Sequence, residues 1–300
     1  MRTETITSAQ NPKIKNLLLL QEKSKARREQ GLFVVEGRRE LEHCLEAGYT
    51  VRTLFVCPEI ASGEAAEGVA SQISGHPRPD KREGPAAEGC GRGRSEAEAI
   101  CEAIPSAVKP LVIEIPEQLY RKVAYRESTE GIIAEVEYKS LSLEDLQLPD
   151  NPLIVVLESV EKPGNLGAVL RSADAAGAHA VLVCDPLTDL YNPNLIRASI
   201  GAIFTVPTVA VSSAQAIPWL KDHGIKILTA QLQDSSLYYD TPMQGGVALV
   251  MGTESTGLTQ PWREAADAHI RIPMLGRLDS LNVSVSTAIL LFEAVRQRQA

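Results

Sequence analysis

Residues 247–258 read V-A-L-V-M-G-T-E-S-T-G-L, and residues 270–285 read I-R-I-P-M-L-G-R-L-D-S-L-N-V-S-V. The first five residues are an apolar run of β-favouring side chains that stops at a turn rich in Gly, Thr and Ser, which is typical of a buried strand in a parallel sheet. Open α/β sheets bind their ligands at the carboxyl ends of such strands. The stretch therefore predicts a ligand site made of strand, loop and helix, with Ser280 or Asn282 as the cap of the helix.

Strand-like and helix-like segments alternate through the second half of the chain. This alternation predicts an α/β domain with a parallel sheet covered by helices on both faces, which we assign to residues 153–300. Residues 139–152, rich in Ser, Leu, Asp, Glu and Pro, are interpreted as the linker before it. The expected strands are 153–158, 180–184, 204–211 and 225–230. A loop at 163–167 is expected to lead into a helix that ends near 177, and further helices are expected at 194–199 and 214–223.

Residues 1–138 are expected to form a smaller α/β domain, since 300 residues that are 44% apolar are ample for two packed domains. A strand near residue 31, a helix ending near residue 47 and a strand at 51–57 give it a β-α-β start. Two more strands are expected at 111–115 and 131–138, on either side of a helix around 117–124. Residues 60–105 are rich in Gly, Ala, Glu, Pro, Arg and Ser and contain no aromatic side chain, which predicts a disordered insertion.

The amino-terminal segment is basic although the formal net charge of the protein is −8. Residues 1–28 hold seven Lys or Arg and two Glu, and local charge rather than the total sets the electrostatic footprint of a protein. Only 4% of residues are aromatic, so contacts to RNA are expected through charge more than through base stacking. A solvated helix face is the alternative interpretation of these charges. The residues expected to contact RNA phosphates are Lys13, Lys15, Lys25, Arg28 and Arg38.

Five cysteines, at positions 44, 57, 90, 101 and 184, show no C-x-x-C pair and no His grouping at zinc spacing. They are interpreted as reduced thiols in a protein without a metal site. No apolar run approaches 18 residues and the first residues are polar, so neither a membrane span nor a signal peptide is expected. The predicted location is the cytoplasm.

Three separated blocks of polar residues carry the most specific signal. The first, N-x-G-x-x-x-R, holds Asn165, Gly167 and Arg171, and alone it is neither a dinucleotide fingerprint nor a P-loop. The second is G-x-E-x-x-G-L at 252–258, and the third is I-P-M-x-G followed by S-L-N-V-S-V at 272–285. In this order and spacing the blocks resemble the three motifs of the SpoU, or TrmH-like, branch of the SPOUT RNA methyltransferases.

The resemblance extends over nearly the whole chain outside the insertion. A-S-I-G-A-I-F at 198–204, preceded by Arg197, and I-T-S-A-Q-N-P-K-I-K at 6–15 are also similar to that family. It implies a carboxyl-terminal α/β domain with a deep trefoil knot, a feature nearly absent from other proteins, and an amino-terminal RNA substrate-binding domain of ribosomal-protein-like α/β type. It also implies a homodimer in which each active site is completed at the subunit interface, and an RNA contact at Arg197.

The activity that the resemblance implies is 2′-O-ribose methylation of RNA with S-adenosylmethionine. The positions that match the family's cofactor contacts are Thr229, Gly252, Ile272 and Leu281. The ribose hydroxyl must meet the sulfonium methyl in line while its proton is lost, which requires oriented polar groups and little bulk water. The candidates for that work are Asn165, Arg171, Glu254, Ser280 and Asn282.

The roles of two candidates stay open. Family accounts make Arg171 a general base, but a guanidinium is effectively always charged, so we expect it to hold a phosphate and to stabilise the developing alkoxide. Glu254 is expected either in catalysis or in bonding backbone N–H groups. An amino-terminal domain of this type favours ribosomal RNA over transfer RNA as the target. The alternatives are a non-catalytic RNA-binding protein with the same fold and, more weakly, a Rossmann-type nucleotide enzyme, which the lack of G-x-G-x-x-G disfavours.

Overall fold

The computed structural model describes residues 2–61, 110–125, 130–253, 256–277 and 279–299. The chain divides into two compact units, Met1–Tyr138 and Lys139–Ala300. Nearly all of the expected insertion at 60–105 lies outside the described residues, as do Cys90 and Cys101. Within the described ranges, no helix is long and apolar enough to cross a membrane, and no group of three His, Cys, Asp or Glu could hold a metal.

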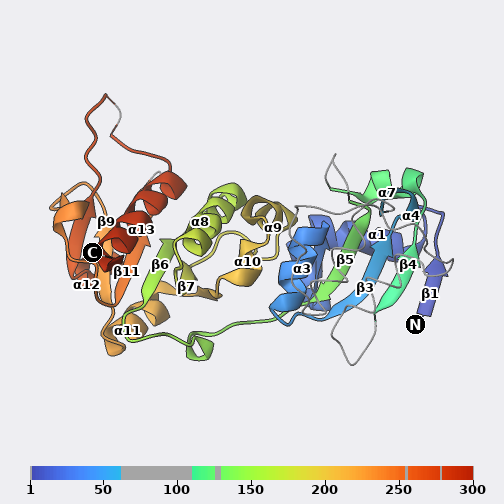
Figure 1. Ribbon diagram of the computed structural model, residues 1–300, viewed down its shortest axis with the longest axis horizontal. Coiled ribbons are helices and arrows are strands. Elements are labelled where there is room, and N and C mark those ends of the chain that lie inside the picture. The colour runs from blue at the N-terminus through green and yellow to red at the C-terminus, as the bar shows by residue number, and fades with distance from the viewer. Residues whose placement is uncertain (1, 62–109, 126–129, 254–255, 278, 300) are drawn as a thin grey trace, which may run out of the picture. The chain divides into compact units, whose positions relative to one another are not determined.

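The first unit contains a five-stranded mixed sheet. Its strands are β1 (Arg2–Thr5), β2 (Leu32–Glu36), β3 (Val51–Val56), β4 (Leu111–Glu114) and β5 (Ile132–Glu137). They lie in the order β1-β4-β3-β5-β2, with β4 parallel to β1 and β3, and β5 antiparallel to β3 and β2; β1, β3, β4 and β5 are labelled in Figure 1. β1 was not expected, because R-T-E-T lacks the apolar alternation of a half-buried strand.

Helix α1 (Pro12–Glu22) begins at Asn11, whose side chain accepts a hydrogen bond from the Lys13 amide at 2.9 Å, and Pro12 fits the first helical position. Its apolar face, which includes the fully buried Ile14 and Leu17, packs into the core of the first unit. The other described helices of this unit are α2 (Ser24–Gln30), α3 (Arg38–Glu46), α4 (Pro58–Ala61) and α7 (Glu117–Val123).

The second unit contains a seven-stranded sheet in which every pair is parallel, as expected. Its strands are β6 (Leu153–Glu158), β7 (Ala180–Cys184), β8 (Thr208–Val211), β9 (Lys226–Ala230), β10 (Ser236–Leu237), β11 (Val247–Met251) and β12 (Ala268–Arg271). They lie in the order β10-β12-β9-β11-β6-β7-β8. The strand of the stretch quoted first, β11, is therefore central and fully covered, which is why all five of its side chains are apolar.

Helices cover both faces of this sheet. On one side α8 (Pro163–Ala175) packs against α9 (Pro193–Ser199), α10 (Ala202–Thr205) and α13 (Val283–Gln299), as Figure 1 shows. On the other side α11 (Ser213–Asp222) and α12 (Gln260–Ala265) bury Leu220 and Trp262 against alternate strand residues. Arg298 fastens the end of α13 by donating to four backbone carbonyls, at distances from 2.6 to 3.1 Å.

Two segments differ from the expectation. The strand expected at 204–211 begins only at Thr208, because Gly201, with a φ of 83°, starts the short α10 and Pro207 follows it. Residues 139–152, interpreted as a linker, lie within the second unit. There Leu143 is buried in the hydrophobic core, and Leu141, Leu146 and Leu148 pack against it.

Candidate active site

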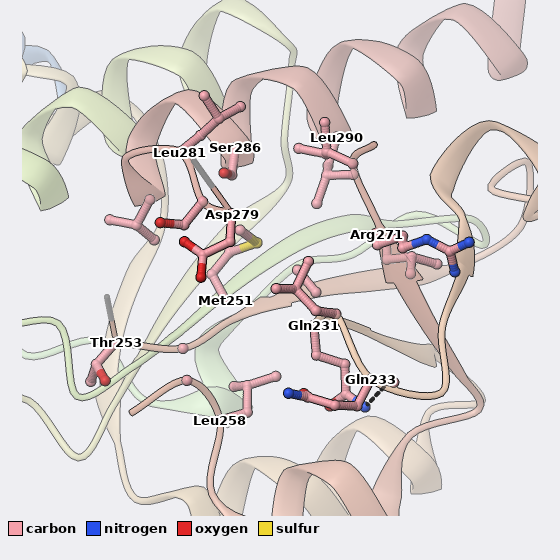
Figure 2. Close-up of a pocket in the computed structure, with 18 of the residues that line it drawn as sticks. Gln231, Gln233, Met251, Thr253, Leu258, Arg271, Asp279, Leu281, Ser286 and Leu290 are labelled. Carbon is pink, nitrogen blue, oxygen red and sulfur yellow. Dashed lines mark hydrogen bonds between the residues drawn. The ribbon is translucent and has the colours of Figure 1, made fainter. Parts of the chain in front are cut away.

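A cavity of about 370 Å³ lies at the carboxyl ends of β9, β11 and β12. In Figure 2, Leu281, Ser286 and Leu290 lie on one side of it and Gln231, Gln233 and Leu258 on the opposite side, with Asp279 between them. The walls therefore come from α13 with its preceding loop, and from the loops that follow β9 and β11. The volume is within the range of about 300–1,000 Å³ that is usual for pockets that bind small molecules.

The loop after β11 can close because of two glycines. The Thr253 amide donates to the Gly257 carbonyl at 3.3 Å and the Gly257 amide donates back at 3.1 Å. Gly257 has a φ of +68°, which side-chain-bearing residues rarely adopt. A Cβ added at Gly252 would lie 2.3 Å from the Gly257 carbonyl carbon, so only glycine fits there.

A buried carboxylate holds the far end of the same loop. Glu158, at the end of β6, is 2% exposed and accepts hydrogen bonds from the Thr259 amide at 2.9 Å and the Thr259 hydroxyl at 2.5 Å. Thr259 directly follows Leu258, which is buried and lines the cavity. Glu158 therefore positions the cavity wall without lining that cavity.

A second, smaller cavity of about 140 Å³ adjoins the first. Gly252, Thr253 and Val283 line both, and Asn165 of α8 lines only the second. The Asn282 side-chain amide donates to Asn165 Oδ1 at 3.1 Å, although the two residues are 117 positions apart. This hydrogen bond joins the first sequence block to the third.

Asn282 also starts α13. Its Oδ1 accepts from the Ser284 amide at 3.0 Å and from the Ser284 hydroxyl at 2.6 Å, which makes Asn282 rather than Ser280 the capping residue. One amide side chain therefore fixes both the start of α13 and the orientation of Asn165.

Known proteins match both units. A model of the SpoU rRNA methylase family matches residues 152–292, and a model of the MRM3-like substrate-binding domain matches residues 11–77. The 23S rRNA (guanosine-2′-O-)-methyltransferase RlmB of Salmonella typhi is 43% identical over 175 residues, which are 56% of this chain and 72% of that protein. The chain belongs to the SpoU rRNA methylase family. The expected family, α/β fold class and class of enzyme, an RNA methyltransferase, are confirmed with it.

Solved structures of RNA methyltransferases resemble this chain over nearly its full length. A crystal structure of an RNA 2′-O-ribose methyltransferase is 36% identical with a TM-score of 0.75, covering 99% of this chain and 100% of that one. The AdoMet-bound rRNA methyltransferase of Sinorhizobium meliloti is 27% identical with a TM-score of 0.79, covering 98% of each chain. The expected cofactor, S-adenosylmethionine, is thus the ligand of a structural neighbour of this SpoU methylase.

The structure brings together most of the positions taken from the SpoU motifs. Gly252, Ile272, Ser280 and Leu281 all line the larger cavity. Thr229 does not line it: its side chain is fully buried, and its hydroxyl lies 2.6 Å from His269 Nδ1. The next residue, Ala230, lines the cavity instead. Glu254 lies outside the described residues.

Arg171 lies away from both cavities of this SpoU methylase. It is exposed on α8, six residues after Asn165, which is about 240° around a helix of 3.6 residues per turn. It lies on the same face of α8 as Gly167, four residues earlier. At Gly167 the helices α8 and α9 are so close that a Cβ added to this glycine would lie 2.5 Å from the Ala198 side chain. Within one chain, therefore, the first block delivers Asn165 to the site but not Arg171.

The residues expected to contact RNA are not equally available. Lys15, Lys25 and Arg28 are exposed, and Lys13 forms an ion pair with Glu4. Arg38 is half-buried: its Nε and Nη2 atoms are buried and have no hydrogen-bond partner in the described ranges. This burial argues against Arg38 as a surface phosphate contact.

Two further arginines, Arg197 and Arg263, line pockets close to the residues of the three SpoU blocks. Arg197 is exposed and lines an open pocket of about 310 Å³ beside the start of α8. Arg263 of α12 lines the larger cavity, and no sequence pattern had singled it out. A helix of only six residues, such as Gln260–Ala265, gives no sequence signal of which side chain faces a ligand.

Proposed function

We propose that this protein methylates the 2′-hydroxyl of a ribose in ribosomal RNA with S-adenosylmethionine as the methyl donor. The observation that carries the proposal is the pair of adjoining cavities, one lined by Gly252, Ile272 and Leu281 and the other by Asn165, held together by the Asn165–Asn282 hydrogen bond. Support comes also from the relatives, whose names give 23S rRNA and the guanosine 2′-oxygen as target. The cytoplasm is the proposed location.

The larger cavity suits the cofactor chemically. Its wall combines apolar groups, such as Leu281 and Leu290, with backbone at Gly252 and Gly257 and with polar side chains. The Gln231 side-chain oxygen is buried and has no hydrogen-bond donor within the described residues, so it can accept from a ligand amino group. S-adenosylmethionine, when bound, supplies an electrophilic methyl group on a sulfonium.

The protein's own residues then orient the nucleophile. Asn165, held by Asn282, presents its amide at the junction of the two cavities, where a ribose hydroxyl can hydrogen-bond to it. Ser280 lies on the loop before α13 and lines the larger cavity. Arg171 acts as a charged clamp on the adjacent phosphate and stabilises the developing alkoxide. Both proposed roles of Glu254, in catalysis or in bonding backbone N–H groups, are kept, since it lies outside the described residues.

A homodimer accounts for the position of Arg171. The exposed side of α13 carries Val285 and Phe292, which are 47% and 50% exposed and seven residues apart on one helical face. α13 also packs against α8, the helix of Arg171. Pairing two chains through this apolar face buries it and carries Arg171 toward the partner's cavities. We propose the trefoil knot of the family for the chain around the larger cavity, where the loops after β11 and β12 meet.

The test is methyl transfer from labelled cofactor to bacterial ribosomal RNA that lacks the modification, with the product mapped by resistance of the 2′-O-methylated position to alkaline cleavage. The expected result is one protected position. Transfer RNA as the only substrate would overturn the choice of target. RNA binding without any transfer would instead favour a non-catalytic RNA-binding protein.

Mixing two inactive variants tests the shared site. Asn165→Ala and Arg171→Ala disable different contributors, so a heterodimer of the two carries one intact composite site. Recovery of activity on mixing supports the dimer. Two folded variants that stay inactive when mixed, or a monomeric wild type in sedimentation, contradict it.

A further inference from the structure

Arg263 is a charged residue in the larger cavity that the proposed chemistry does not use. It belongs to α12 and lines the cavity beside Gly257, where a built Cβ would lie 3.6 Å from its Nη2 atom. Its Nε atom is buried and has no hydrogen-bond partner among the described residues. No ion pair of Arg263 with a carboxylate occurs in the part of the chain that the structure describes.

A guanidinium with a buried N–H group that has no acceptor favours the binding of an anion. The group keeps its charge at neutral pH, and a buried N–H without an acceptor destabilises the protein that contains it. Hydrogen bonds between arginine and a carboxylate are strong, because both partners are charged and the two N–H groups match the two oxygens. A carboxylate that enters the cavity therefore gains more from Arg263 than it would from an exposed side chain.

The other charged residues of the cavity point to the same ligand group. Arg271 of β12 already donates from Nη1 to the Ser235 hydroxyl at 3.4 Å. Asp279, labelled in Figure 2 between Met251 and Leu281, adds one negative charge on the loop before α13. S-adenosylmethionine has one anionic group, the carboxylate of its methionine part, together with a cationic ammonium and a cationic sulfonium. A wall with one free guanidinium and one carboxylate suits both signs.

We propose that Arg263 binds the carboxylate of the methionine part of the cofactor. The inference rests on the proposed function, since it assigns a role within the S-adenosylmethionine site. It makes Arg263 a residue that determines cofactor specificity: the guanidinium selects ligands that keep the amino-acid carboxylate and holds the methionine part in one orientation.

The experiment is a cycle of two proteins and two ligands, measured by isothermal titration calorimetry without RNA. The proteins are wild type and Arg263→Met, and the ligands are S-adenosylmethionine and its decarboxylated analogue. Loss of a charge-assisted hydrogen-bonded pair weakens binding by about tenfold to a hundredfold. We expect that loss when the carboxylate is removed from the ligand, and the same loss when Arg263 is removed from the protein. Arg263→Met should bind the two ligands with equal affinity.

Arg271→Met is the matched control. It removes a second guanidinium from the same cavity wall and should preserve the preference of the wild type for the carboxylated ligand. If Arg271→Met abolishes that preference and Arg263→Met retains it, the carboxylate is bound by Arg271 and the proposal is overturned. Thermal melting of each variant reports folding. If Arg263→Met is unfolded, Arg263→Lys, which keeps the charge without the two-pronged geometry, should show a reduced preference for the carboxylated ligand.

The affinities of the wild-type protein for the two ligands also test the proposal without any variant. Equal affinity of wild-type protein for the two ligands overturns the role of Arg263 while leaving the proposed function in place. Wild-type protein that binds neither ligand overturns the proposed function itself.

Discussion

Replacing Gly252 by alanine tests whether close backbone contact after β11 shapes the cofactor cavity. The added Cβ would lie 2.3 Å from the Gly257 carbonyl carbon and 2.5 Å from the Leu258 nitrogen, whereas ordinary contacts begin near 3.4 Å. The backbone at Gly257 must therefore retreat by about 1 Å. Leu258 is buried and Glu158 holds the following Thr259 by two hydrogen bonds, so this movement meets resistance.

The expected magnitude follows from that resistance. Overpacking of a well-packed site costs about 1–3 kcal/mol, and we expect Gly252→Ala to lower the free energy of unfolding by that amount. The displaced residues line the cavity, so the affinity for S-adenosylmethionine should fall at least about tenfold, which corresponds to about 1.4 kcal/mol. Urea unfolding and calorimetric titration measure the two quantities.

Gly276→Ala is the control, since a Cβ there meets no atom within 4 Å and the residue has no left-handed φ. It should change the free energy of unfolding by less than about 0.5 kcal/mol and leave cofactor binding intact. The reasoning is refuted if Gly252→Ala unfolds at the same urea concentration as the wild type and binds the cofactor with unchanged affinity.

Three further outcomes are expected. Gly167→Ala should lower the free energy of unfolding because its Cβ would clash with the backbone of α9. Gly164→Ala in the same helix is the control, since a Cβ there has no atom within 4 Å, and it should leave that free energy unchanged. Equal shifts of the urea midpoint in the two variants would contradict the packing argument. Arg171→Ala should lose about 2–5 kcal/mol of transition-state stabilisation in single-turnover methyl transfer, with Arg171→Lys keeping part of the activity and both binding cofactor normally; weakened cofactor binding would place the residue in the other cavity. Lys15→Glu with Arg28→Glu should weaken RNA binding and flatten its dependence on salt, and an unchanged salt series would make these residues a solvated face.

The local order of elements around the site could be predicted from the sequence. A five-residue apolar run of β-favouring residues that ends at a glycine-rich turn indicates a short buried strand, and the cap at Asn282 is a contact between residues two positions apart. Both features depend only on residues that are close together in the chain, so they can be predicted from the sequence alone. The prediction failed at residues 204–207, where α10 extends to Thr205 and the strand begins only after Pro207.

The sequence by itself thus determined the parallel α/β architecture, the three blocks and their family. Only the tertiary structure decided which block residues meet. Asn165 reaches Asn282 because α13 packs against α8, a contact between helices far apart in the sequence. Arg171 points away from the site because of its position on α8, the Nε and Nη2 atoms of Arg38 are buried, and Arg263 lines the cavity from a helix that carries no motif. Hydrophobic periodicity says which residues are covered, but the distances between side chains far apart in sequence are set by how strands are ordered and helices rotated.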